Sequence, residues 1–174
     1  PEVIPPNGTT IYTLTAINDA GCSALINDTI VVPAIHITAS ADSLCAGGAA
    51  GLTVTGALNP TWSPAASLSS TSGLSVTAFP AATAVYSVND SISGCYAQDS
   101  ITIYVDAALI VNAGADQTIC HGDSATIAGI VTGGTAPFNY LWTDGSTSLS
   151  ETVSPAATTN YGLTVSNEFG CSKT

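Results

Sequence analysis

Five cysteines are the residues of this chain best suited to covalent chemistry. Cys45 and Cys120 lie in a Leu/Ile-Cys-x-Gly motif and are called marker cysteines below. Cys22, Cys95 and Cys171 each follow a glycine and are called Gly-Cys cysteines. Cys45 and Cys95 are 50 residues apart, and Cys120 and Cys171 are 51 apart. This spacing predicts a disulfide framework, most simply Cys45–Cys95 and Cys120–Cys171, with Cys22 bonded to a partner outside the chain.

A second connection between the cysteines stays open. If one cysteine of a repeat lies at the bottom of its domain and the other at the top, the bond would join neighbouring domains instead. A zinc site is not expected, because the chain has no C-x-x-C or H-x-x-x-H spacing.

The remaining polar residues offer little for catalysis or metal binding. No G-x-S-x-G or other catalytic signature occurs, and His36 and His121 lie in a strand-like run and a glycine turn, so we expect no enzyme. We expect no cofactor either. Calcium is the one candidate, because hard oxygen ligands gather in one segment and at two expected junctions. These carboxylates are Asp116, Asp123, Asp144 and Glu151, and at the junctions Asp42 and Asp106.

Five hydroxyl residues stand between an aspartate and an apolar residue. They are Thr29, Ser43, Ser91, Ser100 and Ser124. The triplet looks like the O-glycosylation motif of periplasmic Bacteroidetes proteins, which would make this a glycoprotein. It also fits the habit of Asp-Ser/Thr pairs to begin strands and turns, so both interpretations stay open.

The elements that position these residues come from a tandem repeat. Tyr12, Tyr86 and Tyr161 recur at intervals of about 75 residues, each tyrosine lying upstream of a Gly-Cys cysteine. The two marker cysteines keep the same interval, and Trp62 and Trp142 each follow a marker by about 20 residues. Several markers in one phase establish the repeat.

The phase of the repeat predicts the domains. Residues 1–33 are expected to be the C-terminal part of one repeat, residues 34–106 a complete repeat, and residues 107–174 a repeat that lacks its last strand. We therefore expect the chain to be part of a longer array.

Each repeat is predicted to be a small all-β sandwich. Short runs such as 11–17, 100–105 and 125–130 alternate apolar and polar residues, and turn residues intervene every 8–12 positions. The aromatic residues Trp62, Trp142, Tyr12, Tyr86 and Tyr161 are expected in the cores. The fold class is thus all-β, with tandem Ig-like or PKD-like β-sandwich repeats of about 73–75 residues.

Composition excludes some partners. The net charge is −11, with one lysine and no arginine, so the chain lacks the clustered basic residues that neutralise nucleic-acid phosphates, and we expect no nucleic-acid partner. The chain has no apolar stretch of the about 18 residues that a membrane-spanning helix needs, so membrane insertion is not expected. A secretion signal, where present, would lie outside these residues.

The motifs resemble the PKD-like and bacterial Ig-like tandem repeats of Bacteroidetes secreted surface adhesins, including gliding-motility proteins exported by the type IX pathway. The resemblance covers nearly the whole chain. It is carried by the start motif at residues 118–124, the tryptophan motifs at 61–70 and 140–146, and the end motif at 155–171. It implies a secreted or cell-surface location.

Three functions follow as hypotheses. The first is a structural or adhesive segment of a long extracellular repeat protein that forms a cell-surface fibre or adhesin stalk. Its partners would be neighbouring repeats of the same chain, and also other fibre strands or surface polysaccharide. The second is a polysaccharide- or protein-binding accessory module, which would need an exposed aromatic platform; an exposed tryptophan would favour it over the first. The third is a subunit of a strand-complemented filament.

Overall fold

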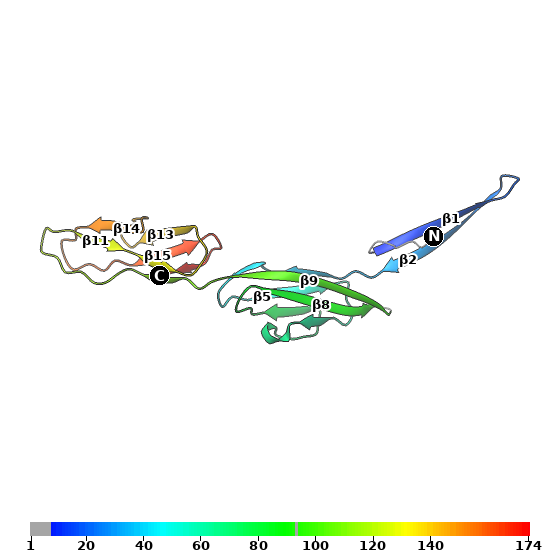
Figure 1. Cartoon of the computed structure of the whole chain (residues 1–174), viewed down its shortest axis with the longest axis horizontal. Coiled ribbons are helices and arrows are strands. Elements are labelled where there is room, and N and C mark those ends of the chain that lie inside the picture. The colour runs from blue at the N-terminus through cyan, green and yellow to red at the C-terminus, as the bar shows by residue number, and fades with distance from the viewer. Residues whose placement is uncertain (1–7, 93) are drawn as a thin grey trace. The chain divides into compact units, whose positions relative to one another are not determined.

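The structure is a computed structural model that describes residues 8–92 and 94–174. Over these residues it is built from β-strands and one short 3-10 turn, Ala65–Ser67 (Figure 1). The prediction of an all-β chain is therefore confirmed. No helix among the described residues has the length and apolar character to cross a membrane.

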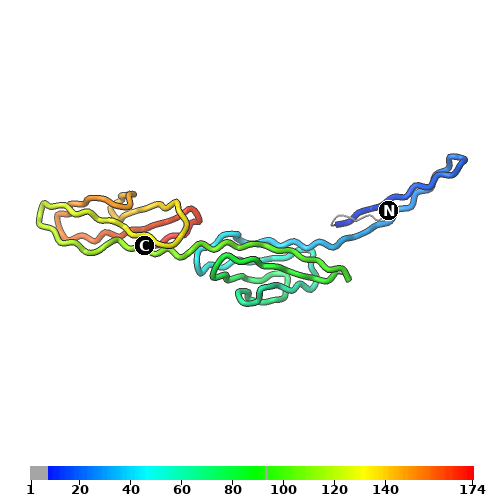
Figure 2. The backbone as a smooth tube through the Cα atoms, in the orientation of Figure 1, coloured from blue at the N-terminus to red at the C-terminus, as the bar shows by residue number. Residues whose placement is uncertain are grey.

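The first element is a long hairpin. Strands β1 (Gly8–Ile17) and β2 (Ser23–Val32) pair antiparallel in continuous register from Gly8↔Val32 to Ile17↔Ser23, and Figure 2 traces them as two neighbouring segments. The alternation of apolar and hydroxyl residues suits both strands to pairing. Apolar side chains of the hairpin, among them Leu14, Ile17 and Leu25, are more than 60% exposed.

Residues 36–106 form a sandwich of two sheets. One sheet has the order β3-β5-β7 and the other β4-β9-β8-β6. The strands are β3 (His36–Ala39), β4 (Ser43–Cys45), β5 (Ala50–Thr55), β6 (Thr61–Ser63), β7 (Ser75–Ala78), β8 (Ala84–Ile92) and β9 (Cys95–Asp106). The residues that alternate inward, such as Leu52, Val54 and Val88, are buried.

Residues 110–173 repeat this plan. The strands are β10 (Ile110–Asn112), β11 (Ala125–Ala128), β12 (Ile130–Thr132), β13 (Phe138–Trp142), β14 (Ser150–Val153), β15 (Leu163–Asn167) and β16 (Ser172–Lys173). The strand pairings correspond between the two repeats. The pair β10–β12 matches β3–β5, the pair β11–β14 matches β5–β7, and the three-stranded sheet β13-β15-β16 matches β6-β8-β9. The counterpart of β5 is split in two around Gly129, where an added Cβ would lie 2.3 Å from the Leu163 side chain.

The core aromatic residues lie at matching places. Trp62 and Trp142 are each 1% exposed, and Tyr86 is fully buried. The Trp62 indole N–H donates to the Gly73 carbonyl and that of Trp142 to the Ser148 carbonyl, both at 2.8 Å. Because the two acceptors lie one repeat period apart, the two cores have the same internal plan. Tyr161 is half-buried against the second core, and Tyr12 is half-buried on β1.

By its contacts the chain divides into two compact units. The first takes residues up to Ser40, 50–79 and 85–102, and the second takes 41–49, 80–84 and 103–174. The second unit thus includes β4 and the end of β9 together with the last repeat. The domain boundaries at 33/34 and 106/107 stay predictions from the repeat phase.

The segments at the two predicted boundaries, called linkers below, contain Ala34 and Ala108, and each lies close to a glycine turn within one unit. An added Cβ at Gly56 would lie 2.4 Å from the Ala34 carbonyl oxygen, and one at Gly133 would lie 2.0 Å from that of Ala108. Both glycines have positive φ, +80° and +71°. Only glycine meets both demands, so these turns hold the linker backbone at close range.

Candidate functional site: the disulfide and its buried aspartate

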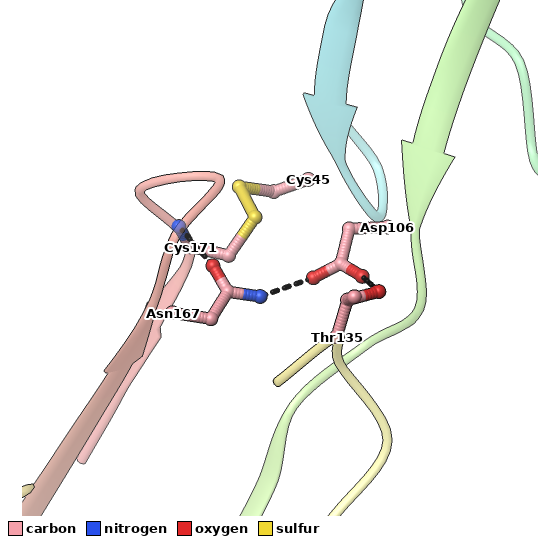
Figure 3. The surroundings of a disulfide bond; sticks show 5 residues. All are labelled: Cys45, Asp106, Thr135, Asn167 and Cys171. Carbon is pink, nitrogen blue, oxygen red and sulfur yellow. Dashed lines mark hydrogen bonds between the residues drawn. A yellow bond between two sulfur atoms is a disulfide. The ribbon is translucent and has the colours of Figure 1, made fainter. Parts of the chain in front are cut away.

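The second unit contains a disulfide between Cys45 and Cys171, with the Cα atoms 5.6 Å apart (Figure 3). This corrects the favoured pairing of Cys45 with Cys95 and of Cys120 with Cys171. Cys95, Cys120 and Cys22 are exposed thiols. The bond connects a marker cysteine to the Gly-Cys cysteine of the following repeat, as in the alternative left open by the sequence.

Strand β9 explains why Cys45 does not bond to Cys95. Cys45 is the register partner of Asp106, the last residue of β9, whereas Cys95 is its first residue. At about 3.3 Å per residue, the 11 intervening steps separate the two ends by roughly 36 Å. A disulfide requires Cα atoms within about 7 Å, so Cys95 is out of reach.

A five-residue turn presents Cys171. The Cys171 N–H donates to the Asn167 side-chain oxygen at 3.0 Å, and the Asn167 N–H donates to the Cys171 carbonyl at 3.0 Å. Gly170 has φ +76°, which the turn requires. The turn from Asn18 to Cys22 has the same pair of bonds, at 2.9 and 3.0 Å. The same hydrogen-bonded turn therefore presents a Gly-Cys cysteine in two of the repeats.

Asp106 lies beside the disulfide and is 6% exposed. It accepts a hydrogen bond from the Thr135 hydroxyl at 2.6 Å and another from the Asn167 side-chain amide (Figure 3). The hydrogen bond from the Thr135 hydroxyl has the largest effect on the pKa of the Asp106 carboxyl group. Together with the Asn167 amide it outweighs burial and lowers the pKa of Asp106. Asn167 therefore contacts both the aspartate and the cysteine, and it links the polar network to the disulfide.

Sequence reasoning named Asp106 only as a junction carboxylate and missed Thr135 and Asn167. The repeat held one usable signal, since Asn18 and Asn167 both stand four residues before a Gly-Cys cysteine. Thr135 had no such signal, because its contact with Asp106 joins residues 29 positions apart.

The carboxylates considered for calcium are dispersed. Among the described residues, His, Cys, Asp and Glu form no group of three or more with the spacing to hold a metal ion. Asp42, Asp116, Asp123 and Asp144 are exposed. Glu151 lies on β14, and one of its carboxylate oxygens is buried without a hydrogen-bond partner in the part of the chain that is described.

Four of the five candidate glycosylation residues, Thr29, Ser91, Ser100 and Ser124, are exposed, whereas Ser43 is half-buried on β4. The backbone N–H groups of Ser91 and Ser100 bond to the preceding aspartates at 2.7 and 2.8 Å. Ser91 lies on β8 and Ser100 on β9, and both residues are exposed on their strands. Their modification stays a prediction.

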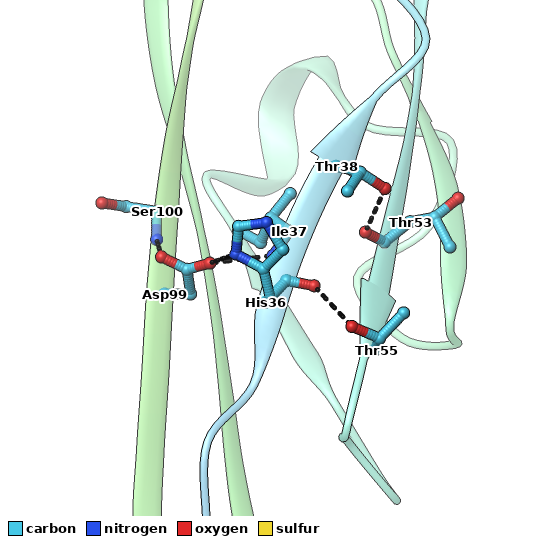
Figure 4. A network of polar contacts seen from close by, with 7 residues as sticks. All are labelled: His36, Ile37, Thr38, Thr53, Thr55, Asp99 and Ser100. Atoms are coloured by element: carbon cyan, nitrogen blue, oxygen red, sulfur yellow. Dashed lines mark hydrogen bonds and ion pairs between the residues drawn. The ribbon is translucent and has the colours of Figure 1, made fainter. Parts of the chain in front are cut away.

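His36 forms part of a polar contact between strands of the first unit. Its ring lies 3.3 Å from the Asp99 carboxylate, which also accepts the Ile37 N–H at 2.8 Å (Figure 4). Asp99 of β9 thereby holds the start of β3. This arrangement offers no nucleophile, and its geometry is that of a structural contact. His121 is exposed in the turn after the second marker cysteine.

The comparisons with known proteins bear on the fold. No family model matches the chain, and no curated protein matches it. The chain is similar to the crystal structure of the N-terminal eight Ig domains of Down Syndrome Cell Adhesion Molecule (DSCAM) isoform 1.30.30, with 16% identity and a TM-score of 0.60. The match covers 92% of this chain and 29% of that chain. The chain therefore has an immunoglobulin-like β-sandwich fold.

Proposed function

We propose that this chain is a structural segment of an extracellular, adhesin-type repeat protein, in which each repeat is fastened to the next. The observation that carries the proposal is the Cys45–Cys171 disulfide. It joins residues that the repeat phase assigns to successive repeats, 126 positions apart. A bond of this kind resists separation of the repeats along the chain, which is what a fibre or stalk needs.

The surroundings of the bond support a stiff connection. Asp106 ends β9 and is held by Thr135 and Asn167, both from the following repeat. The Gly133 turn lies against the linker at Ala108. Charge-assisted hydrogen bonds of this type contribute about 1.5–3 kcal/mol each, and here they act on a linker of only a few residues.

The rival role as a polysaccharide-binding module has less support. Such a role would use exposed tryptophan faces, and both indoles are 1% exposed with their N–H groups already bonded. We therefore rank the structural role first.

The proposed location is the cell surface. Disulfides persist in oxidising compartments, and a single lysine leaves little for trypsin-like proteases to cleave. The motifs that resemble Bacteroidetes surface repeats fit this location, as does the set of exposed hydroxyls in Asp-Ser/Thr triplets. An Ig-like fold without a catalytic constellation suits a non-enzymatic protein.

Antibodies against residues 34–174 test the proposal on intact cells of the source organism. We expect labelling without permeabilisation, and immunogold electron microscopy should place the label along surface fibres or stalks. Labelling that requires permeabilised cells would refute the location. Labelling of discrete secreted particles would favour the accessory-module role.

A further inference from the structure

A groove of about 670 Å³ opens in the second unit between residues 113–121 and residues 155–161. Residues 113–120 have no strand partner within the described chain, and Trp142 and Val153 contribute to the lining of the groove. The Cys120 thiol lies at this groove and is exposed. A segment without a strand partner next to a groove is the arrangement that accepts an added strand.

The corresponding place one repeat earlier is filled. Ser43–Cys45 pairs in parallel with Tyr104–Asp106 of β9. The Tyr104 N–H donates to the Asp42 carbonyl at 2.8 Å, and the Val105 N–H donates to the Thr83 hydroxyl at 3.0 Å. The end of β9 thus lies between the marker segment and the loop that contains Thr83.

The repeat phase places the same two hydrogen-bond acceptors around the groove. Gln117–Cys120 corresponds to Asp42–Cys45, and Pro155–Thr158 corresponds to Pro80–Thr83. The groove therefore has the backbone acceptor at Gln117 and the hydroxyl acceptor at Thr158 that a strand like the end of β9 would use.

The cysteines follow the same rule. The bonded pair joins the marker cysteine of one repeat to the Gly-Cys cysteine of the next. By this rule Cys120 needs a Gly-Cys cysteine from a following repeat, while Cys22 and Cys95 need marker cysteines from preceding repeats. None of these partners lies within residues 1–174, and these three cysteines are the ones that carry free thiols.

We propose that the groove and Cys120 form an acceptor site for a further repeat of this same kind. A strand with the sequence pattern of residues 99–106 enters the groove and pairs with Thr118–Cys120. The Gly-Cys turn of the repeat that follows this strand then forms a disulfide with Cys120, as Cys171 does with Cys45 one repeat earlier. The proposal rests on the structural role proposed above and adds the identity of the partner and its register.

The disulfide step requires an oxidant, for which glutathione disulfide serves. The Cys120 thiolate attacks one glutathione sulfur and releases one glutathione thiol. The thiolate of the arriving cysteine then attacks the Cys120 sulfur and releases the second. Two protein thiols are oxidised, one glutathione disulfide is reduced, and the two thiol protons end on glutathione.

A synthetic peptide with the sequence of residues 99–106 tests the groove on the full chain. The readout is the alkylation rate of Cys120, with Cys22 and Cys95 of the same molecule as internal controls. We expect the peptide to slow alkylation of Cys120 by at least about threefold and to leave the other two rates unchanged.

Two matched controls sharpen this test. A peptide methylated on the tyrosine nitrogen cannot make the bond that Tyr104 makes to the Asp42 carbonyl, so it should protect poorly. The Thr158→Val chain lacks the hydroxyl acceptor and should also lose protection. Equal protection by both peptides, equal slowing of all three cysteines, or no protection at millimolar peptide would overturn the strand acceptor.

Disulfide mapping in a glutathione redox buffer tests the pairing rule, with a second copy of the chain as the probe. We expect Cys120 of one copy to bond to a Gly-Cys cysteine, Cys95 or Cys22, of another. A majority of Cys120–Cys120 products would overturn the rule. Neither result depends on where the protein is found in cells, so failure of this site is distinguishable from failure of the proposed function.

Discussion

The disulfide limits how far the chain can be stretched. A molecule pulled from its two ends cannot extend the segment enclosed by an intact bond. Cys45 and Cys171 enclose 126 residues. At about 3.5 Å per extended residue, that segment amounts to roughly 440 Å of hidden length, or about 44 nm.

The pairing suggested by the cysteine spacing predicts a different released length. Bonds Cys45–Cys95 and Cys120–Cys171 would enclose 50 and 51 residues, 101 in all. Reduction would then release about 35 nm, and the two bonds would open in two separate steps of about 18 nm each. The two connectivities thus differ by about 9 nm in length and by the number of steps.

Single-molecule force spectroscopy on the fully unfolded chain measures this length before and after dithiothreitol is added. We expect one step of about 44 nm, which the double variant Cys45→Ser/Cys171→Ser should release without reductant. Cys95→Ser is the matched control and should leave the step unchanged. Two steps of about 18 nm, or a step abolished by Cys95→Ser, would refute the connectivity described here.

Three further outcomes are expected from stability measurements. The pKa values of Asp90 and Asp106 are lowered, Asp90 chiefly by the Leu58 N–H and Asp106 chiefly by the Thr135 hydroxyl. The stability that these carboxylates contribute is therefore complete above the unfolded pKa of about 3.9 and is lost as pH falls through their folded pKa values. Asp106→Asn should therefore reduce the fall of the denaturant midpoint with decreasing pH below about pH 4. An unchanged dependence of the midpoint on pH would contradict this. Trp142→Ala should cost about 3–5 kcal/mol in urea unfolding, whereas a loss below about 1 kcal/mol would place the indole outside a packed core. Gly133→Ala should cost on the order of 2 kcal/mol or more in the same assay, and Gly145→Ala, which has positive φ but open space, should cost less; equal losses would remove the argument from the Ala108 contact.

Much of the fold follows from the repeat. Trp62 and Trp142 mark the same position in two sandwiches, and β7 and β14 begin one period apart, at Ser75 and Ser150, as the phase predicts. Alternation of apolar and polar residues predicts strands because side chains on a strand point to opposite faces in turn. These patterns involve residues close in the sequence or one period apart, so they can be recognised in a single sequence.

The partner of Cys45 could not be predicted in the same way. A repeat makes Cys45–Cys95 and Cys45–Cys171 equally regular, since both distances recur with the period. The choice depends on which end of β9 lies beside β4, and this is set by a parallel pairing of three residues. Asn167 and Thr135 were missed for a related reason, because their contacts with Asp106 join residues 61 and 29 positions apart.

The loop closed by Cys45 and Cys171 is longer than the repeat period, because its 126 residues span well over one repeat. If every repeat boundary carries the same bond, successive loops overlap, and each peptide bond of the array lies inside at least one of them. A single proteolytic cut then leaves the two fragments covalently attached through the bond that spans the cut. Under this design, release of the distal repeats requires at least three cuts in the right places or reduction, so damage to one chain position does not release them.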